Sequence, residues 1–130
     1  MSFINMALND VKLDSEKQPV PESLYDLVIK RHIMNKQETG ICCFIGISGH
    51  PEARDITYNI NFPQASDDEE KASWKLKFAK AFLVLFNIDI ADDGSWDSDD
   101  LESATAADVP VEISEYKGVA RNEIAIMSYL

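Results

Sequence analysis

Apolar and polar residues alternate along three segments in the first half of the chain, residues 24–34, 41–48 and 56–62. A period of two is typical of a half-buried β-strand, because neighbouring side chains on a strand point to opposite faces. Short stretches that are polar or contain glycine and proline separate the three segments. The pattern therefore predicts three successive strands joined by turns.

The alternation also predicts which side chains of the first strand share a face. It places Ile33 on the apolar face and His32 on the opposite face. It places Lys30 and Arg31 on different faces, so we expect only one of these two cations to line any given groove.

The hydrophobic period changes after residue 62. Large apolar residues then recur every three to four positions over residues 71–86, which predicts an amphipathic α-helix. Ser66 is the candidate N-cap, with Glu69 three positions later as in a capping box. Lysines occupy the rest of this helix, and we expect a solvated face, with an extension of a basic patch as the alternative. These lysines are Lys71, Lys75, Lys77 and Lys80.

Two further strands are predicted at residues 109–115 and 119–129. They are joined through Lys117-Gly118, and a short turn containing glycine between two such runs indicates a hairpin. The element order is then β-β-β-α-β-β, which is that of the OB-fold, a small five-stranded Greek-key barrel. We therefore predict an all-β fold with one helix: an OB-fold barrel whose end the helix covers, with an acidic loop after the helix.

The length of 130 residues predicts a single domain that can bury its own core. Residues 1–20 mix apolar and polar positions and end near two prolines, so we expect an N-terminal arm with some anchoring contacts. Residues 21–130 form the predicted OB-fold domain, and residues 87–108 form the acidic loop within it, which is too polar to pack and is expected to be mobile.

The negative charge of the chain is concentrated in one segment. Residues 87–115 contain ten of the 23 acidic residues and no Lys or Arg, whereas the whole chain has a net charge of -11. The other 101 residues carry 12 basic and 13 acidic side chains, a net charge of -1. The acidic composition therefore does not exclude an anionic ligand for the body of the protein.

Five segments carry a recognisable pattern: 8–11 (LNDV), 21–29 (PESLYDLVI), 56–63 with the acidic helix start after it, 78–86 (FAKAFLVLF) and 111–124 (VEISEYKGVARNEI). Together they resemble small phage-encoded single-stranded-DNA-binding proteins of the OB-fold type. The resemblance implies a non-catalytic protein of phage DNA replication or recombination in the host-cell cytoplasm, which binds along a barrel face. Ser23-Leu24 departs from the pattern, because such proteins often have Gly before the tyrosine of strand one.

Binding single strands without sequence preference requires cations along the phosphates and aromatic faces for the bases. The candidate stacking residues are Phe44, which alternates away from the apolar face of its strand, and Tyr116 at the predicted hairpin. For Phe44 the alternative is a position in the core or under the arm. Tyr58 and Trp96 are weaker candidates, since Tyr58 lies on the apolar face of its strand. The candidate cations on strands and turns are Lys30, Arg31, Lys36, Arg54, Lys117 and Arg121.

The acidic segment has three interpretations. It is a solvated loop with no specific role, an electrostatic mimic of DNA that occupies the basic groove or recruits partners, or a calcium loop. The calcium interpretation has the weakness that Ala91 replaces one ligand of the EF-hand register. The residues that fit this register are Asp89, Asp93, Gly94, Asp97 and Asp100. The candidate partner-binding residues are Asp92, Asp93, Asp97, Asp99 and Asp100.

The sequence contains no catalytic triad order, no phosphate-binding glycine loop and no His-Glu metal helix. The adjacent Cys42 and Cys43 point to opposite faces of a strand, so we expect one in the core and one partly exposed, without a mutual disulfide. We expect no cofactor. We expect no metal site, because the chain has only two His and no spaced Cys cluster. We expect no membrane partner, because no apolar run reaches 18 residues. These features favour a cytoplasmic, non-enzymatic protein.

The function that we predict is the coating of single-stranded DNA without sequence preference in phage replication or recombination, by a dimer or a cooperative array. Phage replication or recombination proteins are expected as further partners. The alternative is an OB-like protein-interaction module that recruits a basic replication or recombination partner through its acidic loop. A third interpretation is an enzyme or inhibitor with an unrecognised site.

Overall fold

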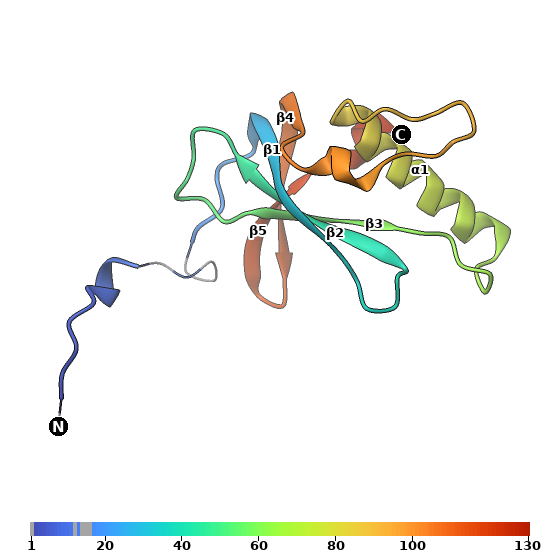
Figure 1. The fold of residues 1–130 in the computed structure, drawn as a ribbon. Helices are drawn as coiled ribbons and strands as arrows, with labels where there is room; N and C mark the ends of the chain where they lie inside the picture. Colours follow the sequence, from blue (N-terminus) through green and yellow to red (C-terminus); the bar gives the residue numbers. More distant parts are fainter. Residues whose placement is uncertain (1, 12, 14–16) are drawn as a thin grey trace.

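The computed structural model describes residues 2–11, 13 and 17–130 of the chain. Five antiparallel strands form one sheet in the order β3-β2-β1-β4-β5, with a single α-helix beside it (Figure 1). The predicted β-rich fold with one helix is therefore confirmed. The strands are β1 (Ser23–Met34), β2 (Gly40–Ile47), β3 (Ile56–Asn61), β4 (Thr105–Tyr116) and β5 (Val119–Ile124). The helices are α1 (Glu69–Leu85) and the short 3-10 helices η1 (Leu8–Asp10), η3 (Ser98–Leu101) and η4 (Ile126–Tyr129).

Strand β1 lies at the centre of the sheet, paired with β2 on one side and β4 on the other. Strands β3 and β5 are the two edges, and some of their Cα atoms approach within 8 Å of one another. Among the described residues, no backbone ladder joins these two edges, so the sheet is curved but not closed by hydrogen bonds.

The core lies between the concave face of this sheet and α1. Phe82 and Phe86 of α1 are buried, and their rings pack 4.8 Å apart between centroids. Tyr58 of β3 stacks on Phe82 at 4.2 Å with an interplanar angle of 8°, and its hydroxyl donates to the carbonyl oxygen of Phe78 at 3.0 Å. Each large apolar side chain buried in this way contributes roughly 1.5–3 kcal/mol. These contacts hold α1 against β3.

The ends of two predicted elements differ in the structure. The N-cap of α1 is Asp68, whose carboxylate accepts a hydrogen bond from the Lys71 amide at 2.7 Å, so the predicted N-cap at Ser66 is wrong. Both residue types cap helices well, and the chain uses the one next to the first helical turn. The predicted last strand is too long: β5 ends at Ile124, and residues 126–129 turn into η4, which packs against α1.

The acidic segment connects α1 to β4 and contains η3. Strand β4 begins at Thr105, so the last four residues of the predicted loop belong to the sheet. The prediction that this segment is too polar to pack is wrong for Ile88 and Leu101, which are buried in the core. The Ser103 amide donates to the carbonyl oxygen of Ile29 at 2.9 Å, which ties the end of the segment to β1.

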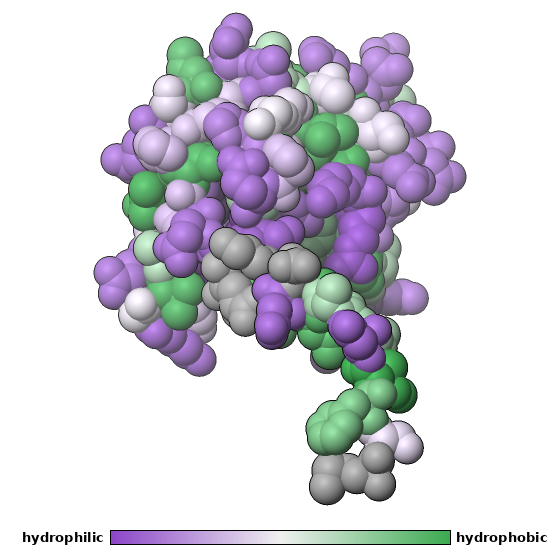
Figure 2. All heavy atoms as spheres, turned by 90° about the vertical axis from the view of Figure 1, so that its left-hand side faces the viewer, coloured by the Kyte–Doolittle hydropathy of each residue, from purple (hydrophilic) through white to green (hydrophobic). Residues whose placement is uncertain are grey.

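The N-terminal arm extends away from the body (Figure 1). It is anchored at Val20, whose N–H donates to Oδ1 of Asn122 at 2.8 Å and whose carbonyl accepts from Nδ2 of the same side chain at 2.9 Å. Next to this anchor, the Tyr25 hydroxyl donates to the carbonyl oxygen of Pro21 at 2.6 Å. The apolar side chains closer to the N-terminus are exposed, and Figure 2 shows them in green below a mostly hydrophilic face. No helix in the described part of the chain has the length and apolar character needed to cross a bilayer.

Candidate nucleic-acid interface

A β-bulge at Lys30 decides which side chains of β1 face away from the core. Ile29 pairs with Ile45 of β2, and Arg31 pairs with Phe44, so two residues of β1 oppose one residue of β2. The extra residue reverses the alternation beyond this point. His32 therefore lies opposite the buried Cys43, whereas Ile33 is exposed, and the predicted faces of His32 and Ile33 are wrong.

The same bulge brings Lys30 and Arg31 to one face, so the prediction that they point to opposite faces is also wrong. A Cβ added to Gly46 would lie 2.8 Å from Cδ of Lys30, which places the Lys30 stem over Gly46. The Arg31 guanidinium lies over the ring of Phe44, 4.1 Å from its centroid. Gly46 and Phe44 are two positions apart on β2, so both cations lie on the face of the sheet opposite the core, which we call the outer face.

Phe44 is half-buried on this outer face and does not belong to the core cluster. The Arg31 guanidinium lies over its ring, the position of a cation–π interaction. The exposed side of such a guanidinium is a flat surface on which a nucleic-acid base can stack. Arg31 is thus the group placed for stacking, and Phe44 supports it.

Lys30 is only partly available to an anion. Its ammonium forms an ion pair with Asp55, at 3.0 Å and 3.2 Å from the two carboxylate oxygens. The Lys30 side chain is 54% exposed and that of Asp55 is 25% exposed, so the pair lies at the surface, where such pairs contribute little to stability. A phosphate would compete with Asp55 for this cation.

The β4–β5 hairpin carries a second cation–aromatic group. Tyr116 pairs with Val119 across the two-residue turn Lys117-Gly118, which confirms the predicted hairpin. Both turn residues have positive φ, 52° and 79°, as a type I′ turn requires. The Arg121 guanidinium lies 4.8 Å from the Tyr116 ring centroid, and the Lys117 ammonium lies 5.3 Å from it. Tyr116 is 54% exposed, so its ring is accessible.

Both cation–aromatic groups lie on the outer face. Arg121 pairs with Ser114, two positions from Tyr116 and on the same face. The neighbouring pair, Ile113 and Asn122, is on the other face, where Asn122 is buried. The turns of the β1–β2 and β4–β5 hairpins both project towards the lower edge of Figure 1. Lys36 is exposed on the first of these turns, while Arg54 is half-buried in the connection between β2 and β3. The structure therefore assembles two groups, Lys30-Arg31-Phe44 and Tyr116-Lys117-Arg121, on one face.

The outer face also carries negative charge that the sequence analysis did not predict. Glu112 and Glu123 are directly opposite each other on β4 and β5, on the same side of the hairpin as Arg121. Like charges at opposed positions destabilise a strand pair and would repel a phosphate. The alternation of β4 and β5 contains the signal for this pair, but the register between the strands is needed to recognise it. Thr57 and Asn59 are further polar groups of this face, on β3.

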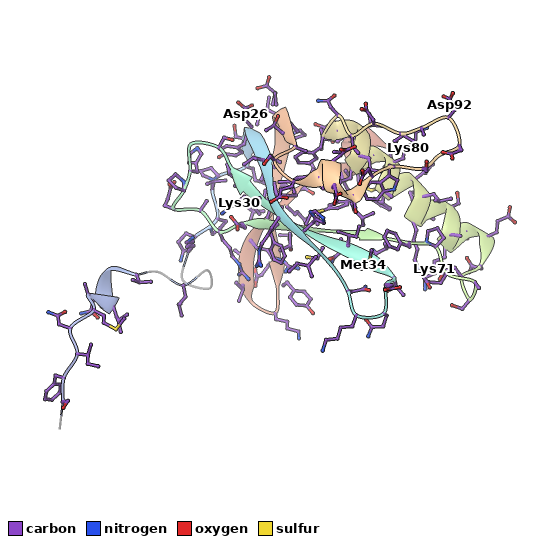
Figure 3. All side chains as sticks on the ribbon, viewed as in Figure 1. Asp26, Lys30, Met34, Lys71, Lys80 and Asp92 are labelled. Atoms are coloured by element: carbon purple, nitrogen blue, oxygen red, sulfur yellow. The ribbon has the colours of Figure 1, made fainter. Side chains whose placement is uncertain are left out.

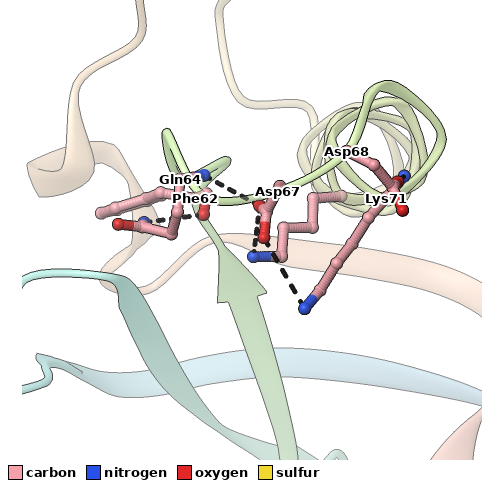
Figure 4. Close-up of polar contacts among 6 residues, drawn as sticks. Phe62, Gln64, Asp67, Asp68 and Lys71 are labelled. Atoms are coloured by element: carbon pink, nitrogen blue, oxygen red, sulfur yellow. Dashed lines mark hydrogen bonds and ion pairs between the residues drawn. The ribbon is translucent and has the colours of Figure 1, made fainter.

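Two of the lysines near the start of α1 form ion pairs with one carboxylate. Asp67 is bound by Lys75 at 2.7 Å and by Lys71 at 3.6 Å, and its side chain is only 4% exposed (Figure 4). It also accepts a hydrogen bond from the Gln64 amide. The hydrogen bond from Lys75, followed by that from Gln64, lowers the pKa of Asp67.

Two weaker candidates do not contribute to the outer face. Tyr58 packs in the core on Phe82, and burial, with a smaller contribution from Cys43, raises its pKa to about 12. Trp96 is half-buried in the acidic segment and packs against the core cluster. Cys43 is buried and Cys42 is partly exposed, and both are free thiols, as predicted. Burial raises the pKa of Cys42, and the nearby Arg31 charge partly offsets this effect.

The five candidate partner-binding aspartates are exposed on the acidic segment. Figure 3 places Asp92 at the upper right and Lys30 on the left of the sheet, with α1 between them in that view, so the segment does not cover Lys30. Asp93 accepts hydrogen bonds from the amide and hydroxyl of Ser95, and Asp97 caps η3 by accepting from the Asp99 amide. Within the described residues, no three His, Cys, Asp or Glu side chains are grouped as a metal site would need, the proposed EF-hand register included.

No family model matches the chain, and the search of curated proteins finds no match.

Proposed function

We propose that this protein binds single-stranded DNA without sequence preference, along the outer face of its sheet, during phage DNA replication or recombination in the host-cell cytoplasm. The observation that carries the proposal is the repeated cation–aromatic pair, Arg31 over Phe44 and Arg121 over Tyr116, on one face. Stacked bases contribute about 1–3 kcal/mol each, and every base offers a π-face, so such pairs suit binding without sequence preference.

We infer further that the sheet is that of an OB-fold barrel, a five-stranded Greek-key barrel that is partly open. The support for this inference is the approach of the two edge strands, β3 and β5, to within 8 Å between Cα atoms, with β1 at the centre of the sheet. In such a barrel the outer face is continuous, so the groups at Arg31 and Arg121 belong to one binding surface.

The proposal is tested by fluorescence-anisotropy titration of labelled oligo-dT at two or more salt concentrations. Binding that weakens as salt rises is expected, because phosphate contacts release counterions. Arg31→Ala should weaken binding by about tenfold or more, and Arg31→Lys, which keeps the charge but removes the planar group, should recover only part of the loss.

Lys80→Ala is the matched control, because it removes one exposed positive charge on α1, away from the outer face. It should leave affinity within about twofold of the native protein. A native protein that does not bind oligo-dT below micromolar concentration at low salt would contradict the proposal. Equal losses for Arg31→Ala and Lys80→Ala would show that only bulk charge matters.

A second candidate function is recruitment of a basic replication or recombination partner through the acidic segment. It is favoured by the exposure of the five aspartates on a segment that does not cover Lys30. Because Leu101 is buried and Asp93 and Asp97 form turns, deletion of the segment would disturb the fold. A triple variant in which Asp92, Asp99 and Asp100 are changed to Asn removes the charges and keeps the segment.

This triple variant is compared with Glu69, Glu70 and Glu115 changed to Gln, which alters the net charge equally at exposed sites elsewhere. If the segment recruits a basic partner, only the aspartate variant should lose binding to a Lys/Arg-rich peptide in calorimetry, with its oligo-dT affinity unchanged. If the segment mimics DNA, oligo-dT affinity should rise. Equal effects of the two variants would rule out a specific role for the segment.

A further inference from the structure

The N-terminal arm presents several large apolar side chains that are exposed in this molecule. Phe3 is 90% exposed and Ile4 is 81% exposed, and Met6, Leu8 and Val11 are also more than half exposed. Soluble monomers rarely leave a contiguous apolar segment uncovered, and such segments mark interaction sites. The arm is therefore built to be covered by a surface that this single molecule does not supply.

An apolar groove of about 460 Å³ lies on the opposite part of the body, between the C-terminal half of α1 and η4. Val84, one of its lining residues, is 58% exposed, although it lies in the middle of an apolar run. Two lysines and no acidic residue occur among the described residues that line the groove. These residues are Lys77, Lys80, Ala81, Val84, Leu85, Tyr129 and Leu130.

The arm and the groove match in length and in charge. Lys77 to Leu85 spans about 13 Å of helix at 1.5 Å per residue, and the four extended residues from Phe3 to Met6 span about 13 Å at 3.3 Å per residue. Farther along the arm, the sequence over residues 10–16 holds three acidic residues and one lysine. An apolar end followed by negative charge fits an apolar groove whose rim carries Lys77 and Lys80.

The arm leaves its own body on the side away from this groove. Its base is fixed by the two hydrogen bonds between Val20 and Asn122, and in Figure 1 the arm runs from there to the lower left, whereas α1 and the C-terminus lie at the upper right. Figure 2 shows the apolar arm projecting clear of the body. This direction presents the arm to a neighbouring molecule.

We propose that residues 3–6 of one copy dock in the α1–η4 groove of a second copy. Reciprocal exchange closes a dimer, and head-to-tail exchange builds an array. The inference does not rest on DNA binding, because both surfaces belong to the protein and neither includes the outer face.

Sedimentation velocity of the full-length chain without DNA tests the proposal over a range of concentrations. The native protein should associate as its concentration rises. The arm variant Phe3→Ser/Ile4→Ser should weaken association by at least about tenfold for each buried side chain lost. The groove variant Val84→Glu should weaken it similarly, because it places a charged group in the apolar groove where the apolar end of the arm docks.

Leu24→Ser is the matched control, since Leu24 is 59% exposed but lies on β1, outside the groove. It should leave association unchanged. Lys77→Glu/Lys80→Glu is a second groove variant at two exposed positions, for use if Val84→Glu fails to give a native circular-dichroism spectrum. It should also weaken association.

Mixing the arm variant with the groove variant separates exchange between molecules from other modes of association. The mixture contains one intact groove and one intact arm, so it should form a complex that neither variant forms alone. A native protein that stays monomeric up to about 1 mM would overturn the proposal. So would association that persists in both variants, or a mixture that shows no complex.

Discussion

The side chain of Asn122 makes two hydrogen bonds to the backbone of Val20, which lies 102 residues earlier in the chain. Both groups are buried, and among the described residues that are buried as a whole, Asn122 is the one with a polar side chain. The amide satisfies the N–H and the carbonyl of Val20 together, so the point where the arm leaves the sheet is defined by β5.

Replacement of Asn122 by Ala should destabilise the protein by roughly 2 kcal/mol or more, because it leaves two buried backbone groups unsatisfied at about 1–3 kcal/mol each. Urea unfolding followed by circular dichroism measures this change. Asn59→Ala, at an exposed position of β3, is the control and should cost less than about 0.5 kcal/mol. Equal stability of the two variants would contradict the role assigned to Asn122.

Glu123→Lys should increase both stability and affinity for single-stranded DNA. It replaces a like-charge pair with Glu112 by an opposite-charge pair, a change of about 1 kcal/mol or less. It also adds a cation to the outer face next to Arg121. Unfolding free energy and oligo-dT anisotropy measure the two effects.

Glu115→Lys makes the same charge change on the other face of the hairpin, opposite Ala120. It should raise DNA affinity less and should not increase stability. If the two variants have the same stability and the same affinity for oligo-dT, the position of Glu123 on the outer face has no influence on either quantity.

Asp55→Asn should free Lys30 for a phosphate. The ion pair with Asp55 is at the surface, so its loss should change stability by less than about 1 kcal/mol. The affinity for oligo-dT at low salt should rise, and the salt dependence should become steeper by about one phosphate contact. Lys30→Ala in the Asp55→Asn background should remove this gain. Persistence of the gain in that double variant would contradict the assignment.

Stability should fall at alkaline pH because Tyr58 is buried. Its pKa is raised from 10.0 to about 12, so the stability that its neutral form provides is fully present below pH 10 and is lost as pH rises towards 12. The same reasoning applies to Cys43, whose pKa burial raises from 9.0 to about 12. Because ionisation is linked to unfolding, each of these two groups can lower the unfolding free energy by at most about 2–4 kcal/mol.

Unfolding free energies of the native protein and of Tyr58→Phe across this pH range check the prediction. The variant loses the hydrogen bond to the Phe78 carbonyl, so it should be less stable at neutral pH. Its stability should also fall less between pH 10 and pH 12. A parallel pH dependence in both proteins would show that Tyr58 does not titrate in the folded state as its burial predicts.

Much of the secondary structure was predictable because its signals are local. The first three strands, the single helix and the hairpin at Lys117-Gly118 follow from hydrophobic period and turn chemistry, and the structure contains each of them. The ends were less predictable. Asp68 and Ser66 are both good caps, and residues 126–129 are apolar enough for a strand, but contact with α1 turns them into η4.

The candidate site was predictable in composition but not in arrangement. Residue type and alternation alone made Phe44, Tyr116 and the cations candidates. Their pairing, Arg31 with Phe44 and Arg121 with Tyr116, required the strand registers. The charges that oppose binding, Asp55 and Glu123, were missed because a carboxylate is significant only relative to what faces it.

The sequence by itself determined the order of the elements, the residues available for the core and the concentration of negative charge in one segment, because these properties depend on near neighbours along the chain. The tertiary structure decided that Lys30 and Arg31 share a face. Their common orientation arises from one extra residue in β1 opposite β2, and such a bulge exists only when two strands are paired. That single mismatch in register turns an alternating strand into a surface with two adjacent cations.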